Sequence, residues 1–306
     1  MRSRLLSIGL PRAAALRLVV SVGAACLAPP PVSAAPSGAP VARAVDPSKA
    51  PASVPPWCAP ELDVLADGVC FSRPSAPTGV SGSTSAQESP ATLVIFLHSL
   101  VSANTDWQWQ QQRMLARSGE KNGYSVLFPR GRLGIGPGRD PNTWAWPGSA
   151  EAQRLHEEEV ISEWMAHQRA LEERDGPFDQ VFVFGFSNGA YYATNLAMRG
   201  RVRVHGYGVF AGGSGSKYHR ILGQQTDYRV PVFVGYGTKD PDHPRQRALV
   251  ELLRSLRWPY RQLAAPVGHM ATDSQLDAAI SFLRDTRGAA HKTQTAEVTR
   301  SGAPQP

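Results

Sequence analysis

The sequence feature that most constrains the fold of this chain is a buried-strand pattern followed directly by a turn with the pattern glycine–serine–glycine. Residues 181–184 are four apolar residues, and the pattern Gly-x-Ser-x-Gly follows directly at 185–189. A helical pattern then starts at once, over residues 190–197. Both glycines have a physical role, because a side chain at either position of so tight a turn would collide with neighbouring backbone. Strand, sharp turn and helix in this order are typical of a nucleophile elbow, which presents Ser187 at a strand end.

Two strand ends further along the chain provide an acid and a base for this serine. A serine hydroxyl needs a histidine to accept its proton and an acid to orient that histidine. Asp240 follows the apolar run 230–237, and His269 follows a weaker strand pattern. Both therefore lie where parallel sheets place their functional groups. Asp242, in the same loop as Asp240, is the alternative acid.

The best strand pattern in the first half of the chain indicates where an oxyanion hole would form. It covers residues 91–98 and runs into a loop that starts at Ser99. One amide of an oxyanion hole usually comes from the residue after the nucleophile, here Asn188, and the other from the loop after an earlier strand. We therefore expect Asn188 and this loop to face the same reacting carbonyl oxygen.

Together these elements resemble the α/β-hydrolase superfamily. The closest resemblance is to its small lidless esterases, of the carboxylesterase/phospholipase and polyhydroxybutyrate-depolymerase-like groups, and it covers roughly residues 91–286. The segments that carry it are Leu97-His98-Ser99-Leu100 with Asp106-Trp107, Gly185-Phe186-Ser187-Asn188-Gly189, Gly237-Thr238-Lys239-Asp240 and Gly268-His269. The resemblance implies Ser187 as nucleophile, Asp240 as acid and His269 as base.

The same resemblance maps the second oxyanion amide onto Leu100. The family loop usually reads Leu-His-Gly-x, and the residue after the glycine gives the amide. Here Ser99 replaces that glycine. A serine fits such a turn only if its φ angle stays negative, whereas glycine is freer.

The alternation of strand and helix patterns predicts the fold class. It favours a mostly parallel central sheet with helices on both faces, which is the α/β-hydrolase fold, and we find no insertion large enough for a lid domain. A helix predicted over 151–173 contains Glu157, Glu158 and Glu159. We interpret these three acids as a solvated face near the start of the helix, where negative charge is favourable.

Residues 130–149 form the longest irregular stretch inside the predicted fold. Long loops are often functional, and this one follows a strand, so it should project over the sheet edge near Ser187. Trp144 and Trp146 could line an apolar substrate pocket; alternatively they anchor the loop on the core. The glycines at 134–138 are not followed by a helix start or a Lys-Ser/Thr pair, which excludes a nucleotide-phosphate loop.

The first 34 residues have the pattern of a secretory signal peptide. A basic start precedes an apolar run at 18–28 that is too short to span a bilayer, and small residues offer cleavage after Ala34. We therefore expect a secreted, periplasmic or cell-envelope protein. Lipidation at Cys26 is the alternative, which would anchor the protein as a lipoprotein. No later stretch is long and apolar enough to be a transmembrane helix.

The predicted mature chain divides into a linker at 35–57, a catalytic domain at 58–288 and a disordered tail at 289–306. In an oxidising compartment, Cys58 and Cys70 are expected to form a disulfide that closes a small N-terminal loop. Two cysteines without a nearby histidine do not make a zinc site. No metal or organic cofactor is implied.

The charge does not indicate a nucleic-acid partner. The formal charge of +7 falls to +3 once the four arginines of residues 1–34, a segment without acids, leave with the signal. The remaining basic residues are interspersed with acids. The sequence predicts a secreted serine hydrolase acting on small-molecule or polymeric carboxylic esters. A peptidase or acyltransferase with the same triad, and a non-catalytic binding protein on a hydrolase fold, stay open.

Overall fold

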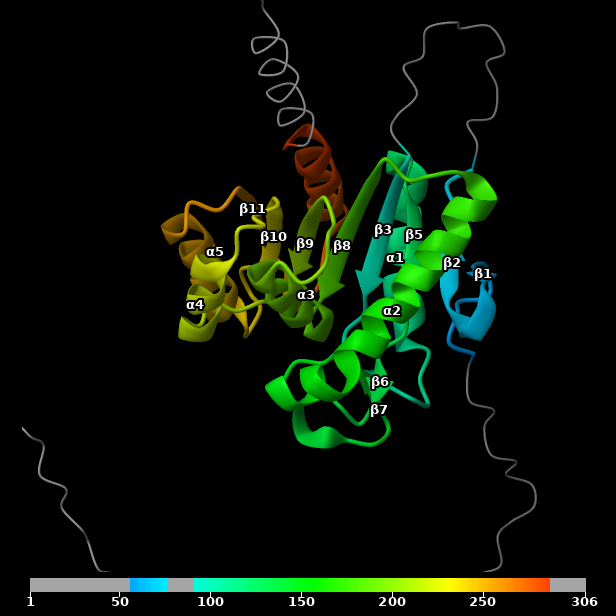
Figure 1. Cartoon of the computed structure of the whole chain (residues 1–306), viewed down its shortest axis with the longest axis horizontal. Coiled ribbons are helices and arrows are strands. Elements are labelled where there is room, and N and C mark those ends of the chain that lie inside the picture. Colours follow the sequence, from blue (N-terminus) through cyan, green and yellow to red (C-terminus); the bar gives the residue numbers. More distant parts are fainter. Residues whose placement is uncertain (1–55, 76–90, 287–306) are drawn as a thin grey trace, which may run out of the picture. The chain divides into compact units, whose positions relative to one another are not determined.

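A central sheet organises the computed structural model, which describes residues 56–75 and 91–286 (Figure 1). In this part of the chain the sheet has eight strands. From one edge to the other they are β1 (Asp63–Val64), β2 (Cys70–Ser72), β5 (Ser125–Phe128), β3 (Thr92–Leu97), β8 (Gln180–Phe186), β9 (Gly206–Phe210), β10 (Val232–Gly237) and β11 (Tyr260–Ala265). The pairs β1–β2 and β2–β5 are antiparallel, and every neighbouring pair from β5 to β11 is parallel.

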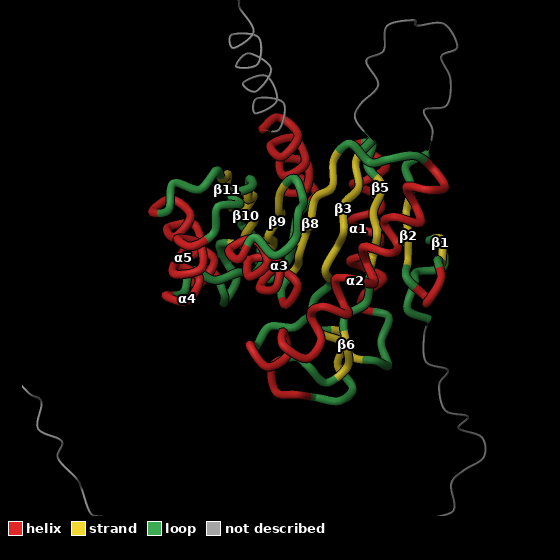
Figure 2. Tube along the Cα trace, viewed as in Figure 1, coloured by secondary structure: helices red, strands yellow, loops and turns green. Residues whose placement is uncertain are grey.

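Helices cover both faces of this sheet, and Figure 2 shows the strands, in yellow, running between helices, in red. They are α1 (Trp107–Asn122), α2 (Ala150–Asp175), α3 (Asn188–Arg199), α4 (Lys217–Gln225) and α5 (His243–Ser255), with short 3-10 turns η1 (Ala66–Gly68) and η2 (Pro137–Arg139). The last described segment, 273–286, is also helical. The sequence patterns at 190–197 and 151–173 predicted α3 and α2.

Two hydrophobic cores lie on opposite faces of the sheet, and β3 contributes to both. Leu93 and Ile95 pack in one core with buried residues of α2, α3 and α5. Val94 and Phe96 pack in the other with α1 and the helix at 273–286. Successive side chains of a strand point to opposite faces, so a strand buried on both faces is an almost continuous apolar run.

This architecture confirms the predicted fold class. A mostly parallel sheet, covered by helices on both faces and carrying a strand–turn–helix at Ser187, is the α/β-hydrolase fold. Within the described residues, no insertion between the sheet strands builds a separate lid domain.

The segment 130–149 is more ordered than its sequence suggests. It contains β6 (Arg132–Leu133) and β7 (Thr143–Ala145), which pair with each other, and β7 also pairs with β4 (Val101–Ser102) in a small antiparallel sheet. The prediction of an irregular loop was therefore wrong. Its strands are short, and one depends on a partner some 40 residues earlier, so no local pattern reveals them.

The Cys58–Cys70 disulfide is present, with Cα atoms 5.4 Å apart, and confirms the predicted pairing. Trp57, which we placed at the end of the linker, packs edge-on against His98 with ring centroids 5.0 Å apart. The packed part of the chain therefore includes the residue before Cys58. The predicted signal peptide at 1–34, Cys26, the predicted linker up to residue 55 and the predicted tail at 289–306 lie outside the described residues. No described helix is long and apolar enough to cross a membrane.

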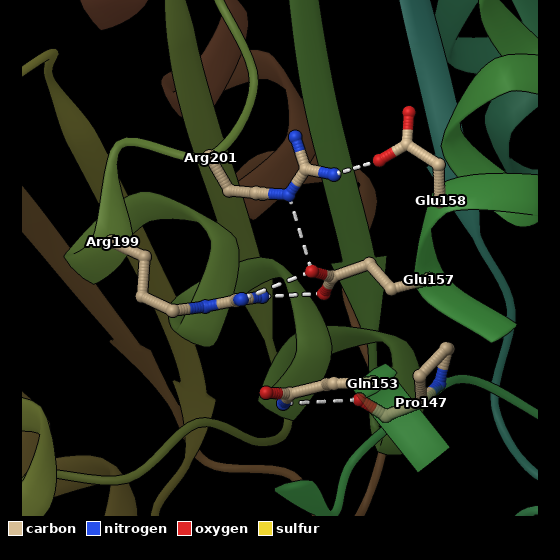
Figure 3. Close-up of polar contacts among 6 residues, drawn as sticks. All are labelled: Pro147, Gln153, Glu157, Glu158, Arg199 and Arg201. Atoms are coloured by element: carbon tan, nitrogen blue, oxygen red, sulfur yellow. Dashed lines mark hydrogen bonds and ion pairs between the residues drawn. The ribbon is translucent and has the colours of Figure 1, made fainter. Parts of the chain in front are cut away.

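The prediction that Glu157 belongs to a solvated face of the helix was wrong. Only 5% of the residue is exposed, because α2 packs here against the end of α3. Its carboxylate accepts hydrogen bonds from Nη1 and Nη2 of Arg199 and, at 3.2 Å, from Nε of Arg201 (Figure 3). Glu158 fits the predicted solvated face, since its side chain is 81% exposed while it pairs with Arg201.

We expect Glu157→Ala to be strongly destabilising. Removing Glu157 leaves the charge of Arg199, whose side chain is only 19% exposed, without its carboxylate, so the loss should approach about 3–5 kcal/mol, the loss for a fully buried pair. Glu158→Ala is the matched control, and an exposed pair of this kind contributes at most about 1 kcal/mol. Urea unfolding of both variants measures the difference. Equal losses would show that the burial of Glu157 has no energetic consequence.

Candidate active site

Ser187 sits in a strained turn between β8 and α3. Its backbone has φ 53° and ψ −114°, a conformation that is uncommon for a residue with a side chain. The two flanking glycines make the turn possible. A Cβ atom on Gly185 would lie 2.3 Å from the carbonyl oxygen of Gly189, and one on Gly189 would lie 2.0 Å from that of Leu97. The Gly-x-Ser-x-Gly pattern is therefore a packing requirement of this turn.

The structure brings Ser187, His269 and Asp240 into one hydrogen-bonded line. Nε2 of His269 lies 2.9 Å from Oγ of Ser187, and Nδ1 lies 3.0 Å from Oδ2 of Asp240. Ser187 follows β8, Asp240 follows β10 and His269 follows β11. The carboxyl ends of these three strands meet at one edge of the parallel sheet. With Asp240 ionised, Nδ1 donates to the carboxylate, and Nε2 is left to accept the serine proton.

Asp240 is held as a carboxylate by three donors. Burial of the group would raise its pKa. The backbone N–H of Asp242 and the side chains of Gln246 and His269 lower it and outweigh burial, so the pKa of Asp240 lies below its ordinary value. Gln246, fully buried on α5, was not predicted. Its only sequence signal is its place on the face of α5 that also carries Leu249, Val250 and Leu253.

Asp242, the alternative acid, does not reach the histidine. Its carboxylate accepts a hydrogen bond from the Tyr191 hydroxyl at 3.0 Å, and lies 3.6 Å from Nη1 of Arg245. Its backbone N–H donates to Asp240. The geometry therefore favours Asp240 as the acid.

The predicted oxyanion residues lie in two anchored segments. Asn188 begins α3, and its side-chain oxygen accepts the backbone N–H of Trp146 at 2.9 Å. Leu100 follows Ser99, which is not among the described residues with positive φ, so serine fits the turn without strain. Gln111 of α1 accepts the Ser99 N–H at 3.0 Å and donates to its Oγ at 2.8 Å. This pair of bonds fixes the loop that glycine would leave freer.

Gln111 was missed from the sequence, and we expect its loss to be costly. Gln111→Ala leaves the buried Ser99 N–H without its acceptor and removes one donor to the Ser99 hydroxyl, which still donates to the Leu100 carbonyl oxygen. We expect a loss of about 1–3 kcal/mol. The double variant Ser99→Ala with Gln111→Leu removes both polar side chains. Its loss of unfolding free energy should therefore be smaller than the sum of the losses of the single variants Ser99→Ala and Gln111→Leu. Urea unfolding measures the coupling. Additive losses would mean that the two residues do not act as a pair.

His98 supports the same loop from behind, as a neutral imidazole. Nδ1 donates to the Ser99 carbonyl oxygen, and Nε2 accepts the N–H of Gly131 at 3.0 Å. The His98 carbonyl oxygen in turn accepts Nε1–H of Trp146 and the N–H of Gly189. Burial is the main cause that lowers the pKa of His98 to about 4, and nearby Arg130 adds to it, although the bond to Ser99 opposes both.

This lowered pKa predicts a loss of stability in mild acid. Between the unfolded pKa of 6.5 and the folded value of about 4, the unfolded chain binds the proton more tightly, so stability falls as pH falls through this window. Between pH 7 and pH 5 the contribution of His98 to this loss is about 2 kcal/mol. Urea unfolding at pH 7 and pH 5 measures this. The unfolding free energy that His98→Gln loses between the two pH values should be smaller than the loss of the parent by about 2 kcal/mol. Identical losses would contradict a buried neutral His98.

The two tryptophans pack against other side chains of the described fold. Trp146 is fully buried and stacks on Tyr192, so it anchors the loop on the core as the alternative reading proposed. Trp144 packs against Arg130, 4.4 Å from the ring centroid, and against Trp57. A cavity of about 640 Å³ beside Asn188 is lined by other residues. Within 56–75 and 91–286, no group of three His, Cys, Asp or Glu side chains is arranged to hold a metal.

Comparisons with known proteins give structural neighbours only. No family model matches the chain, and no curated protein matches it. The F65L variant of Arabidopsis thaliana SOBER1 matches at 15% identity with a TM-score of 0.48, over 63% of this chain and 98% of that one. Esterase PE8 matches at 21% identity with a TM-score of 0.48, over 70% and 98%. FphF, a fluorophosphonate-binding serine hydrolase of Staphylococcus aureus, matches at 12% identity with a TM-score of 0.47, over 71% and 91%. At these values the neighbours assign no activity to this chain.

Proposed function

We propose that this protein is a serine hydrolase that cleaves carboxylic esters. The observation that carries the proposal is the continuous hydrogen-bonded line from Oγ of Ser187 through His269 to Asp240. A base within hydrogen-bond reach of the hydroxyl, itself oriented by a carboxylate, is the arrangement that activates a serine nucleophile.

In the first half of the reaction, Nε2 of His269 takes the Ser187 proton while Oγ attacks the ester carbonyl carbon. The negative charge that develops on the carbonyl oxygen is held by the backbone amides of Asn188 and Leu100. Asp240 stabilises the imidazolium that forms. The tetrahedral intermediate then collapses, and the leaving alcohol oxygen takes the proton from His269.

In the second half, water releases the acyl group. His269, neutral again, takes a proton from a water molecule, which attacks the acyl-enzyme carbonyl. The second tetrahedral intermediate expels Oγ of Ser187, which regains its proton from His269. A carboxylic acid leaves, and the site returns to its starting state.

The state of the oxyanion loop supports an active enzyme over a binding protein on a hydrolase fold. Ser99 in place of the family glycine is the departure from the family pattern in this loop. Here Ser99 keeps an unstrained backbone and is fixed by Gln111. The hydrogen bonds with Gln111 therefore compensate for the replacement of glycine by serine in this loop.

We also propose that the enzyme acts outside the cytoplasm. The signal pattern at 1–34 and the Cys58–Cys70 disulfide support this, because disulfides persist in oxidising compartments. The mass of the exported protein tests it. A mass that starts near Ala35 is expected, whereas a mass starting at a diacylated Cys26 would make it a lipoprotein.

Hydrolysis of 4-nitrophenyl esters of graded acyl length, beside a matched series of 4-nitroanilides, tests the reaction class. We expect turnover of esters, with free carboxylic acid as the product. Faster cleavage of anilides would make the protein a peptidase, and acyl transfer to added alcohols in place of hydrolysis would make it an acyltransferase. No turnover in a folded sample would contradict the proposal.

A further inference from the structure

A cavity of about 640 Å³ opens beside Asn188, the residue after the proposed nucleophile. Its wall includes Asn188, Tyr191 and Arg245, together with the glycine-rich loop at 134–139 and the start of α2. Asn188 also supplies the proposed oxyanion amide, and the N–H of Tyr191 donates to the Ser187 carbonyl oxygen at 3.1 Å. Asn188 is therefore shared by the cavity wall and the proposed oxyanion hole, and a substrate bound at Ser187 would enter the cavity past this residue.

A polar cluster forms one side of this cavity. The Tyr191 hydroxyl donates to Oδ2 of Asp242, and Nη1 of Arg245 lies 3.6 Å from Oδ1 of the same carboxylate. Tyr191 and Arg245 line the cavity, whereas Asp242 is not one of its lining residues. Asp242 therefore contacts both donors without lining the cavity itself. Burial raises the pKa of Tyr191, so its hydroxyl keeps its proton at neutral pH.

Arg245 has donors left for a ligand. A separation of 3.6 Å from Asp242 is an ion pair but too long for a hydrogen bond. The Arg245 side chain is 67% exposed, and a guanidinium has five N–H donors in a fixed fork. A carboxylate that enters the cavity can thus be held by two parallel bonds, as arginine binds carboxylates elsewhere.

The remaining charges of the cavity wall offset each other. Arg139 also lines the cavity, but it forms an ion pair with Glu151, which lines it too. Ile135 and Leu155 contribute apolar surface. The wall therefore combines apolar surface with an exposed cation, Arg245, which lies near Tyr191 and forms an ion pair with Asp242 at 3.6 Å. A cavity of this kind selects ligands that have an apolar body and an anionic group.

We propose that Arg245 is a specificity-determining residue that binds a carboxylate group carried by the ester substrate. This rests on the proposed function, since it assigns the substrate class of the same site. Asp242 holds Arg245 at the cavity wall in the absence of substrate. The substrate carboxylate then competes with Asp242 for the guanidinium.

Matched pairs of esters test this proposal and distinguish the two ends of the substrate. Mono-4-nitrophenyl adipate against 4-nitrophenyl hexanoate places the carboxylate on the acyl part. The butyrate ester of 4-hydroxybenzoate against that of 4-hydroxybenzamide places it on the alcohol part. We expect the anionic member of one pair to have a kcat/KM about tenfold higher, mainly through a lower KM, as charge-assisted hydrogen bonds contribute this much.

Variants show whether Arg245 is the cause. Arg245→Gln should bring the anionic-to-neutral ratio close to one, and Arg245→Lys, which keeps the charge without the fork, should retain part of it. Asp242→Asn should raise the ratio, because the competing carboxylate is gone. Arg254→Gln, an exposed arginine of α5 paired with Glu251, should leave the ratio unchanged.

Three outcomes decide the proposal. A preference in either pair that Arg245→Gln removes supports it. Turnover of neutral esters without a preference for either anionic ester, or a preference that survives Arg245→Gln, overturns it while leaving the ester hydrolase intact. If none of the four esters is hydrolysed, the proposed function fails, and this assignment fails with it.

Discussion

Replacing Ser187 with alanine is expected to lower kcat for ester hydrolysis by about a million-fold. The loss is this large because His269 and Asp240 have no role without the oxygen that attacks the carbonyl. The residual rate comes from the oxyanion amides and substrate binding alone. Hydrolysis of a 4-nitrophenyl ester by purified variant and parent measures it.

Two controls separate this loss from a folding defect. Ser187→Ala keeps the Cβ atom in the strained turn, so its urea midpoint should match that of the parent. Ser162→Ala, an exposed position of α2, should keep full activity. Ester hydrolysis by Ser187→Ala within tenfold of the parent would remove this serine from the mechanism.

Asp240→Asn should lower kcat by about ten thousand-fold, as an asparagine at this position favours the wrong histidine tautomer. The carboxylate accepts Nδ1–H of His269, whereas an amide can offer an N–H to that nitrogen and leave Nε2 protonated. Steady-state kinetics with an uncharged ester measures the loss.

Asp242→Asn is the matched control for this substitution, because Asp242 lies two residues after Asp240 and also carries a carboxylate. It keeps the backbone N–H that donates to Asp240, and its side chain contacts Tyr191 rather than the histidine. Its loss on uncharged esters should therefore stay within about tenfold, far below that of Asp240→Asn. A larger loss from Asp242→Asn would reverse the assignment of the acid.

The residues of the candidate triad could be predicted because each follows a strand pattern. The carboxyl ends of parallel strands meet at one edge of a sheet, so three segments far apart in sequence had to converge. The elbow at Ser187 was also local, since the clash that requires Gly185 and Gly189 arises within and just beside the turn. Local pattern and strand order together were enough to place these groups.

The supporting residues could not be predicted, because their roles depend on helix packing. Gln111 and Gln246 are glutamines in amphipathic helices, and nothing in their neighbourhood shows that one meets Ser99 and the other Asp240. Glu157 likewise looked solvated until α2 packed against the end of α3. Trp146 directly follows β7, and β7 is held in place by its pairing with β4. No local sequence pattern indicates this pairing.

The most direct test of the central claim is labelling of the purified protein with a fluorophosphonate, followed by mass spectrometry to locate the modified residue. The Ser187–His269–Asp240 geometry predicts a single adduct on Ser187, formed in step with the loss of esterase activity. The adduct should be absent from Ser187→Ala. A folded, unlabelled protein, or a protein labelled at another serine, would contradict the assignment of Ser187 as an activated nucleophile.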